Sequence, residues 1–297
     1  MSPDGLEQAN HMIARLRPKE PIRPTIRRYG GTPRSAKHRT VRAERKTMAT
    51  SFGALCSDFY INQRLALKMD LPGKRETVLD LFERIRRFRH QMDRFRRFDG
   101  ELSLESTPVD GAYDWLSMRR TNIRSGSVNP TNLESAYSLH RTILEVAPCY
   151  LSISPIEVDY VELMFGFDLE ANGNHDEIVY DALLADTAIG GLIDTENETP
   201  SDIQPFIGFT LEEDNEKTIV NFEIKTRTST RPISDEKFDD EPISIFLSVR
   251  RNGPINKIDD LKTIFNSLTR QAEQLATDKL LPHMLNPITR AISSRSC

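Results

Sequence analysis

The chain has 297 residues, of which 38% are hydrophobic and 28% charged, and its formal net charge is −4. No apolar run approaches the roughly 20 residues of a membrane-spanning helix, and the basic N-terminus lacks the apolar segment of a secretory signal. Three widely spaced cysteines form neither a disulfide framework nor a metal motif. These observations exclude a membrane protein and a small disulfide scaffold, and they predict a cytoplasmic globular protein.

Charge is distributed unevenly along the chain. Residues 1–47 carry twelve Lys or Arg and four Asp or Glu, a net of +8, so residues 48–297 carry −12. The basic head has Pro-flanked clusters and no apolar periodicity, which predicts a disordered tail and a fold that begins near Met48. The acidic remainder argues against nonspecific nucleic-acid binding by the whole domain, because counterion release requires a basic surface.

The first predicted unit covers residues 48–170. Its apolar residues alternate in some segments and recur every three or four residues in others, which indicates strands and helices respectively. The order βαββαβ is that of a ferredoxin-like unit with a mainly antiparallel sheet. The predicted elements are a strand at 59–69, a helix at 76–98, a short strand at 102–104, a strand at 113–124, a helix at 131–147 and a strand at 157–169.

Within this unit, the second helix has recognisable ends. Thr131 and Glu134 are spaced as a capping box, in which each side chain satisfies a free backbone N–H of the other residue. Pro148 is expected to break the helix after about Ala147, because proline cannot donate the next backbone hydrogen bond.

The second predicted unit covers residues 171–297 and packs on the first. Its pattern is αβββα, so the whole chain is expected to have an α+β fold. The predicted elements are a helix from Asn174 to about Ala185, strands near 206–211, 218–228 and 243–251, and a helix from about Asp259 past Ala276.

The string Gly173-Asn174-His175-Asp176 resembles one block of the calcineurin-like metallophosphoesterases. The resemblance implies a two-metal site, but the Asp-x-His and Gly-Asp blocks of that family are missing and only His283 follows. A helix cap explains the same residues better, with Asn174 as the N-cap and Glu177 completing a capping box. We therefore predict no metal ligand and no cofactor-binding residue here.

The segment from Lys74 to Phe98 carries nine basic and four acidic residues, a net of +5. One hypothesis is that the predicted helix binds phosphates or nucleic acid through Arg84, Arg87, Arg94 and Arg97. The preferred interpretation is a solvated helix face whose arginines pair with acids elsewhere in the domain, because charged faces usually have no binding function.

Other polar groups have similar alternatives. A strand end and turn contain Arg119-Arg120, Arg124 and Ser125-Gly126-Ser127, which could bind an anion through exposed N–H groups, but a polar hairpin is favoured. The string Arg250-Arg251-Asn252-Gly253-Pro254 is interpreted in the same way, as a strand end followed by a Gly-Pro turn. Glu157, Asp159 and Glu162 near one strand are candidates for the chemistry of an enzyme whose residues assemble only in three dimensions, but acids at such positions are commonplace. The sequence has no nucleophile elbow, Walker loop or dinucleotide fingerprint, so no catalytic residue is predicted.

Three stretches carry a resemblance to a known family: residues 51–72, the turn at 124–130, and 159–170 followed by Gly-Asn-His. Together they resemble a family of conserved uncharacterised proteins of planctomycete bacteria. The resemblance begins at about residue 48 and extends to the C-terminus. It implies neither an activity nor any site residue.

The function expected from the sequence is that of a non-catalytic binding or scaffolding module. Its partner would be a protein or a second copy of the chain, since a broad sheet face remains to be covered. The alternative is a nucleic-acid-associated regulatory protein that uses the basic helix 76–98 and the N-terminal tail. An enzyme is the third hypothesis.

Overall fold

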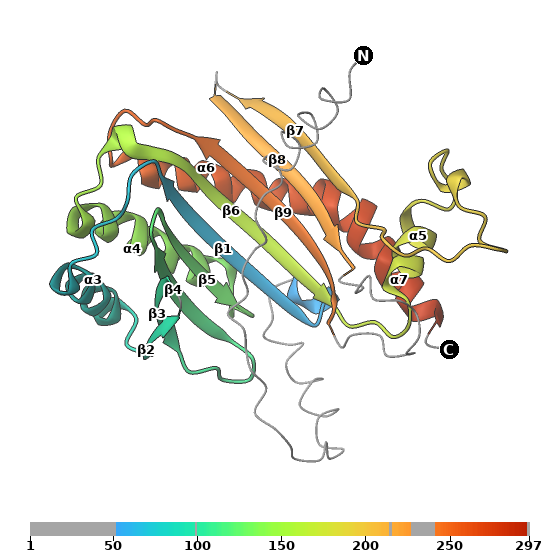
Figure 1. The fold of residues 1–297 in the computed structure, drawn as a ribbon, viewed down its shortest axis with the longest axis horizontal. Coiled ribbons are helices and arrows are strands. Elements are labelled where there is room, and N and C mark those ends of the chain that lie inside the picture. The colour runs from blue at the N-terminus through green and yellow to red at the C-terminus, as the bar shows by residue number, and fades with distance from the viewer. Residues whose placement is uncertain (1–51, 99, 214–215, 227–240, 296–297) are drawn as a thin grey trace, which may run out of the picture. The chain divides into compact units, whose positions relative to one another are not determined.

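An antiparallel sheet of nine strands organises the residues that the structure describes, which are 52–98, 100–213, 216–226 and 241–295 (Figure 1). The structure is a computed structural model. Its strand order is β2-β3-β4-β5-β1-β6-β9-β8-β7. The strands are β1 (Asp58–Leu67), β2 (Met92–Phe98), β3 (Glu101–Ser106), β4 (Tyr113–Arg119), β5 (Asn122–Val128), β6 (Val158–Leu169), β7 (Phe206–Glu213), β8 (Glu216–Lys225) and β9 (Ile243–Asn252).

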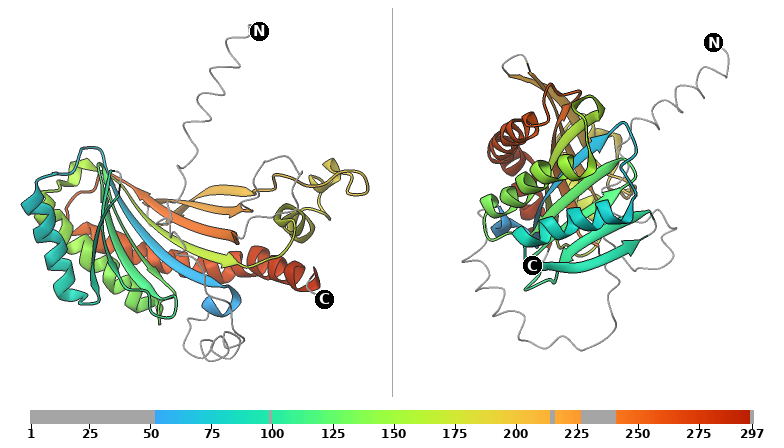
Figure 2. Two further views of the ribbon diagram at one scale, coloured as in Figure 1. Left: turned by 60° about the horizontal axis from the view of Figure 1, so that its bottom comes forward. Right: turned by 90° about the vertical axis from the view of Figure 1, so that its left-hand side faces the viewer.

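The longer helices gather on one face of this sheet (Figure 2). Helices α6, η4 and α7 follow one another directly along the chain, and η4 is a π-helix. The helices are α3 (Arg75–Phe88), α4 (Leu133–Leu151), α5 (His175–Leu183), α6 (Asp260–Leu275), η4 (Ala276–Leu285) and α7 (Asn286–Arg295), with 3-10 turns η1 (Gly53–Leu55), η2 (Pro155–Glu157) and η3 (Gly190–Leu192). Among the described helices, none combines the length and the apolar character that crossing a membrane requires.

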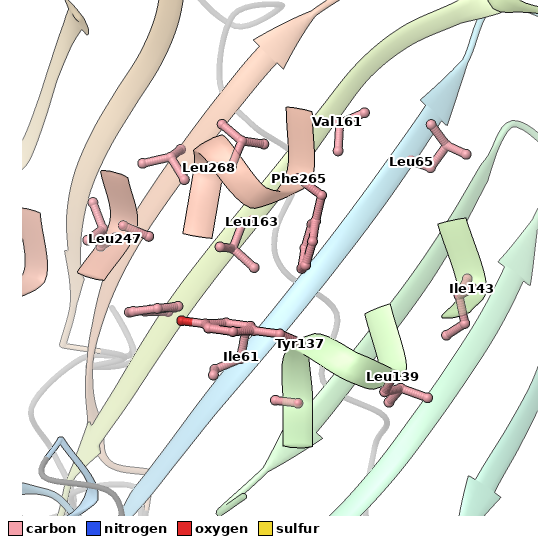
Figure 3. Close-up of a cluster of buried hydrophobic side chains, with 14 of the residues drawn as sticks. Ile61, Leu65, Tyr137, Leu139, Ile143, Val161, Leu163, Leu247, Phe265 and Leu268 are labelled. Atoms are coloured by element: carbon pink, nitrogen blue, oxygen red, sulfur yellow. The ribbon is translucent and has the colours of Figure 1, made fainter. Parts of the chain in front are cut away.

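The core lies between the sheet and helices α4 and α6 (Figure 3). Because side chains alternate along a strand, every second residue of the central strands points to this face. Apolar side chains fill it from both layers, and burial of their surface stabilises the fold by roughly 25 cal/mol per Å². Figure 3 labels Ile61, Leu65, Tyr137, Leu139, Ile143, Val161, Leu163, Leu247, Phe265 and Leu268.

The topology repeats along the chain. A strand, a helix, an antiparallel meander and a second helix occur as β1, α3, β2–β5 and α4, and again as β6, α5, β7–β9 and α6. In each half the first strand returns to pair with the last strand of its own meander, β1 with β5 and β6 with β9. The halves join where β1 pairs with β6 in antiparallel fashion. The boundary predicted at residue 170 differs from this division, because β6 belongs to the predicted unit 48–170 and pairs with β9 of the predicted unit 171–297.

The predicted helix 76–98 is wrong in its second part. Helix α3 ends at Phe88, and Met92–Phe98 forms strand β2, paired with β3. A register shift between Met92 and Arg94 interrupts the alternation of β2, so its apolar residues keep the three-residue spacing of a helix. Gly100, with a φ of +68°, lies in the turn that connects β2 to β3.

The predicted strand 113–124 is also wrong, because it is two strands. β4 ends at Arg119 and β5 begins at Asn122, and these two residues pair across the hairpin. The connecting Arg120 and Thr121 include no Gly, Asn or Asp, so the sequence contains no turn signal there. The predicted unit 48–170 is βαββββαβ with antiparallel neighbours throughout, and the ferredoxin-like arrangement is not confirmed.

Helix α4 differs from its prediction at both ends. Its N-cap is Asn132, whose side chain accepts a 2.8 Å hydrogen bond from the Ser135 N–H, in place of the predicted Thr131–Glu134 box. Pro148 lies within the last turn, and the helix ends only where Ser152 takes a left-handed conformation with φ of +54°. A proline near a helix end removes only one backbone hydrogen bond, which the packed helix tolerates.

The second half confirms its predicted αβββα order in α5, β7, β8, β9 and α6. The mainly antiparallel α+β fold is likewise confirmed. The predicted basic tail, residues 1–47, lies outside the described residues.

Candidate anion-binding site on the open sheet face

The structure separates the four arginines predicted to act together. Arg84 and Arg87 are exposed on α3, whereas Arg94 and Arg97 lie on β2, where residues an odd number apart face opposite sides of the sheet. Arg84 stacks on the Phe88 ring at 4.8 Å from its centroid. The preferred interpretation from the sequence is that these arginines pair with acids elsewhere in the domain. In the described ranges, however, no acidic residue forms an ion pair with any of the four. They nevertheless form no continuous basic helix face, because the helix ends before Arg94.

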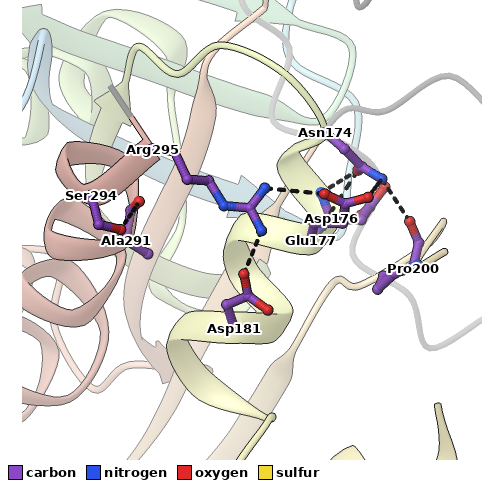
Figure 4. A network of polar contacts seen from close by, with 8 residues as sticks. All are labelled: Asn174, Asp176, Glu177, Asp181, Pro200, Ala291, Ser294 and Arg295. Atoms are coloured by element: carbon purple, nitrogen blue, oxygen red, sulfur yellow. Dashed lines mark hydrogen bonds and ion pairs between the residues drawn. The ribbon is translucent and has the colours of Figure 1, made fainter. Parts of the chain in front are cut away.

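The Gly173–Asp176 motif begins a helix, as predicted. The Asn174 side chain accepts hydrogen bonds from the N–H groups of Asp176 at 2.9 Å and Glu177 at 3.4 Å (Figure 4). Glu177 does not return the predicted backbone bond; it accepts from the Asn174 amide at 3.2 Å and pairs with Arg295 of α7 at 3.1 Å. His175 is buried, with its Nδ1 2.9 Å from the Thr226 carbonyl oxygen. These contacts tie α5 to its neighbours and account for Asn174 and His175 of the motif.

A buried Ser125–His140 pair has the spacing of a catalytic dyad, but it lies in the core. The Ser125 hydroxyl is 2.8 Å from His140 Nδ1 and donates a 3.0 Å hydrogen bond to the Gln63 side-chain oxygen Oε1, and both Ser125 and His140 are fully buried. Burial is the main cause that lowers the pKa of His140 to about 3, so its imidazole is neutral at physiological pH. No substrate can reach this pair, because both residues are fully buried in the core beneath the sheet. Nowhere in the described ranges do three His, Cys, Asp or Glu side chains gather in a metal-holding arrangement.

A row of charged side chains crosses the centre of the opposite, open face of the sheet. Arg64 on β1 lies directly opposite Arg124 on β5 and, on its other side, opposite Glu162 on β6. Glu162 in turn lies opposite Arg250 on β9. The intervening residues of these strands, such as Leu65 and Val161, are buried in the core, so the four charged residues share the other face. We call Arg124, Arg64, Glu162 and Arg250 the arginine row.

The arginine row lacks the ion pairs expected of three guanidinium groups. No carboxylate in the described ranges lies within ion-pair distance of Arg64, Arg124 or Arg250, and Glu162 pairs with none of them. The Nε groups of Arg64 and Arg250 are buried without a hydrogen-bond partner there. Both guanidinium groups instead flank the Tyr160 ring, at 5.3 and 4.8 Å from its centroid. Donor capacity therefore remains unused at the middle of the open face.

The electrostatics of the row are unfavourable without a ligand. Burial, and then the like charges of Arg64 and Arg119, lower the pKa of Arg124 to about 10. Burial also raises the pKa of Glu162, against the opposing effect of the arginines. Like charges directly opposite on neighbouring strands destabilise a sheet, so an anion that neutralised Arg64 and Arg124 would remove an existing cost.

The sequence contained part of the signal for this site. The sequence patterns point to Arg124, Arg250 and Glu162 separately, and no pattern distinguishes Arg64. Only the register of four strands, distant in sequence, brings them into one row. Arg119, at the end of β4, forms a 2.6 Å ion pair with Glu101 nearby on the same face.

Comparisons with known proteins do not assign a family. No protein-family model and no curated protein matches the chain. Among solved structures, the di-domain ARO/CYC BexL from the BE-7585A biosynthetic pathway aligns over 78% of this chain and 98% of its own, with 5% identity and a TM-score of 0.19. That similarity is too low to indicate a shared fold or activity.

Proposed function

We propose that this protein is a non-catalytic binding module whose open sheet face binds an anionic ligand through the arginine row. The observation that supports the proposal is the direct opposition of Arg64 and Arg124 without a carboxylate partner in the described ranges. A structural role alone would favour pairing each of these half-buried arginines with an acid, since unpaired charge away from solvent is costly. We also retain the cytoplasm as the expected location of the protein.

The chemistry of the row favours a ligand with a phosphate or carboxylate group. Guanidinium groups present planar, forked donors that match both anions. The row spans three strand spacings, roughly 15 Å in all, so its ends can contact different groups of one extended ligand. Glu162 would discriminate against ligands whose negative charge continues unbroken across the row. This feature, with the −12 charge of residues 48–297, favours a small polyanion over nucleic acid.

The test is calorimetric titration of the full chain with pyrophosphate, citrate and a ten-nucleotide oligothymidylate. The double variant Arg64→Gln/Arg124→Gln removes the opposed pair, and Arg120→Gln is the matched control because it is exposed and paired with Asp70 at 2.8 Å. All proteins keep the basic N-terminal segment, so its contribution to binding cancels in the comparison.

We expect pyrophosphate or citrate to bind the parent and the control equally, and the double variant about tenfold or more weakly. The reason is that a hydrogen bond to a charged group contributes about 1.5–3 kcal/mol. Equal affinity of parent and double variant would refute the site. Stronger binding of the oligonucleotide than of both small anions, lost in the double variant, would favour the nucleic-acid alternative.

A further inference from the structure

A second, chemically different cavity lies on the helix-covered side, next to edge strand β7. It has a volume of about 430 Å³, within the range of small-molecule pockets. Ile207 on β7 is 56% exposed, so the cavity opens to solvent at the sheet edge. Its lining residues are Leu183, Leu184, Pro205, Ile207, Phe209, Phe222, Lys279, His283 and Met284.

The only basic groups of this lining come from η4. Lys279 and His283 are both exposed, and the Lys279 ammonium lies 4.7 Å from the centroid of the Phe209 ring. No acidic side chain in the described ranges pairs with Lys279. Apolar walls with a cation at the opening match a ligand that has an apolar body and a negatively charged end.

The local helix geometry adds a second reason to consider this cavity functional. Residues Ala276–Leu285 form a π-helix of ten residues, and π-helical segments are rare and frequent at functional sites. Lys279, His283 and Met284 stand four and five residues apart, about one turn of such a helix. The π-helical segment therefore supplies both the cations and part of the apolar wall on one side.

We propose that this cavity binds a single acyl chain that ends in a carboxylate, with the chain between β7 and η4 and the carboxylate at Lys279. A methylene group takes about the volume of one water molecule in the liquid, roughly 30 Å³, so the cavity accommodates a chain of about ten carbons or somewhat more. This site is distinct from the arginine row, which lies on the other face of the sheet and has a polar lining.

The test uses decanoate and 1-decanol, which share the chain and differ in the charged end, each titrated below its aggregation limit into the full chain. Lys279→Gln removes the cation, and Ile207→Trp fills the cavity with a larger side chain. Lys257→Gln is the control, because Lys257 is an exposed lysine outside the lining.

Decanoate is expected to bind with one molecule per chain and more tightly than decanol. Lys279→Gln should lower the affinity for decanoate about fivefold, which is within the usual range of an exposed ion pair. The affinity for decanol should not change. Ile207→Trp should abolish binding of both, and the control should bind as the parent does.

The double variant Arg64→Gln/Arg124→Gln separates this site from the arginine row. This variant should bind decanoate as the parent does, even if it no longer binds pyrophosphate. Loss of decanoate binding in that variant would overturn the inference, as would binding that neither Lys279→Gln nor Ile207→Trp changes. Sedimentation of the parent and Ile207→Trp provides the remaining check: a dimer that dissociates in Ile207→Trp, without decanoate binding, would mean that a second copy of the chain occupies the cavity.

Discussion

The two faces of the central sheet use the same strands for different purposes. Residues such as Leu65 and Val161 pack into an apolar core beneath α4 and α6, whereas the neighbouring Arg64 and Glu162 project from the open face. The covered face is filled mainly by apolar side chains, while the open face carries guanidinium groups whose buried nitrogens have no partner in the described ranges. The difference indicates that one face was shaped by packing and the other by something outside the described residues. Mutations should therefore act mainly on stability on one face and mainly on binding on the other.

The largest effect is expected at Phe265 of α6. Its ring is fully buried and contacts the Tyr137 and His140 rings at centroid distances of 6.2 and 5.8 Å. Phe265→Ala should lower the free energy of unfolding by about 3–5 kcal/mol, because it removes buried surface and leaves a cavity. Urea denaturation measures this change. A loss below about 1 kcal/mol would mean that the covered face is not the principal core.

The next effect is pH-dependent and comes from His140, also on the covered side. Its folded pKa of about 3 lies below its ordinary value of 6.5, so acid favours the unfolded state, which binds the proton. The contribution of neutral His140 to the free energy of unfolding is fully present above pH 6.5. As the pH falls this contribution should be lost, and the free energy of unfolding should be lower by about 2 kcal/mol at pH 5.

Urea unfolding of the parent and His140→Gln between pH 8 and 5 tests this expectation. The variant should have the lower free energy of unfolding at pH 8, and the difference between the two proteins should become smaller as the pH falls to 5. Parallel curves would show that His140 titrates alike in the folded and unfolded states.

A smaller loss is expected from Gly126→Ala on the open face. An added Cβ would lie 2.3 Å from the Trp115 ring and 2.4 Å from the Asn62 side-chain oxygen, so both must shift. Such overpacking should destabilise by about 1–3 kcal/mol. Thermal unfolding measures it, with Gly73→Ala as the control because nothing lies within 4 Å of its added Cβ. An unchanged melting temperature would indicate that Trp115 is loosely held and that the face next to the arginine row is not rigid.

The smallest effect on stability, and the most informative for the comparison, is expected from Arg64→Gln. Relief of the repulsion from Arg124 should offset the lost contact with Tyr160, so stability should change by less than about 1 kcal/mol and in the stabilising direction. Urea denaturation at low and moderate salt measures the change, and the gain should shrink as salt screens the repulsion. A loss above 2 kcal/mol would mean that the arginine row holds the sheet together, contrary to a binding role.

Much of the second half followed from local patterns. The alternation of β6 and β9, the stripe of α6 and the Asn174 cap depend on neighbouring residues, so their signals are present in short windows of sequence. The same reasoning failed at 76–98 and at 113–124. In the first segment a register shift gives the apolar residues of a strand the spacing of a helix. In the second, the residues that connect the two strands include no Gly, Asn or Asp, so the sequence contains no turn signal.

The sequence by itself determined the α+β class, the polar and apolar parity of the central strands and the acidic character of residues 48–297. Only the tertiary structure decided which strands are neighbours, and with that the opposition of Arg64 and Arg124 and the cavity between β7 and η4. The reason is physical: side-chain direction follows from the local backbone period, whereas strand order and register depend on contacts between residues tens of positions apart.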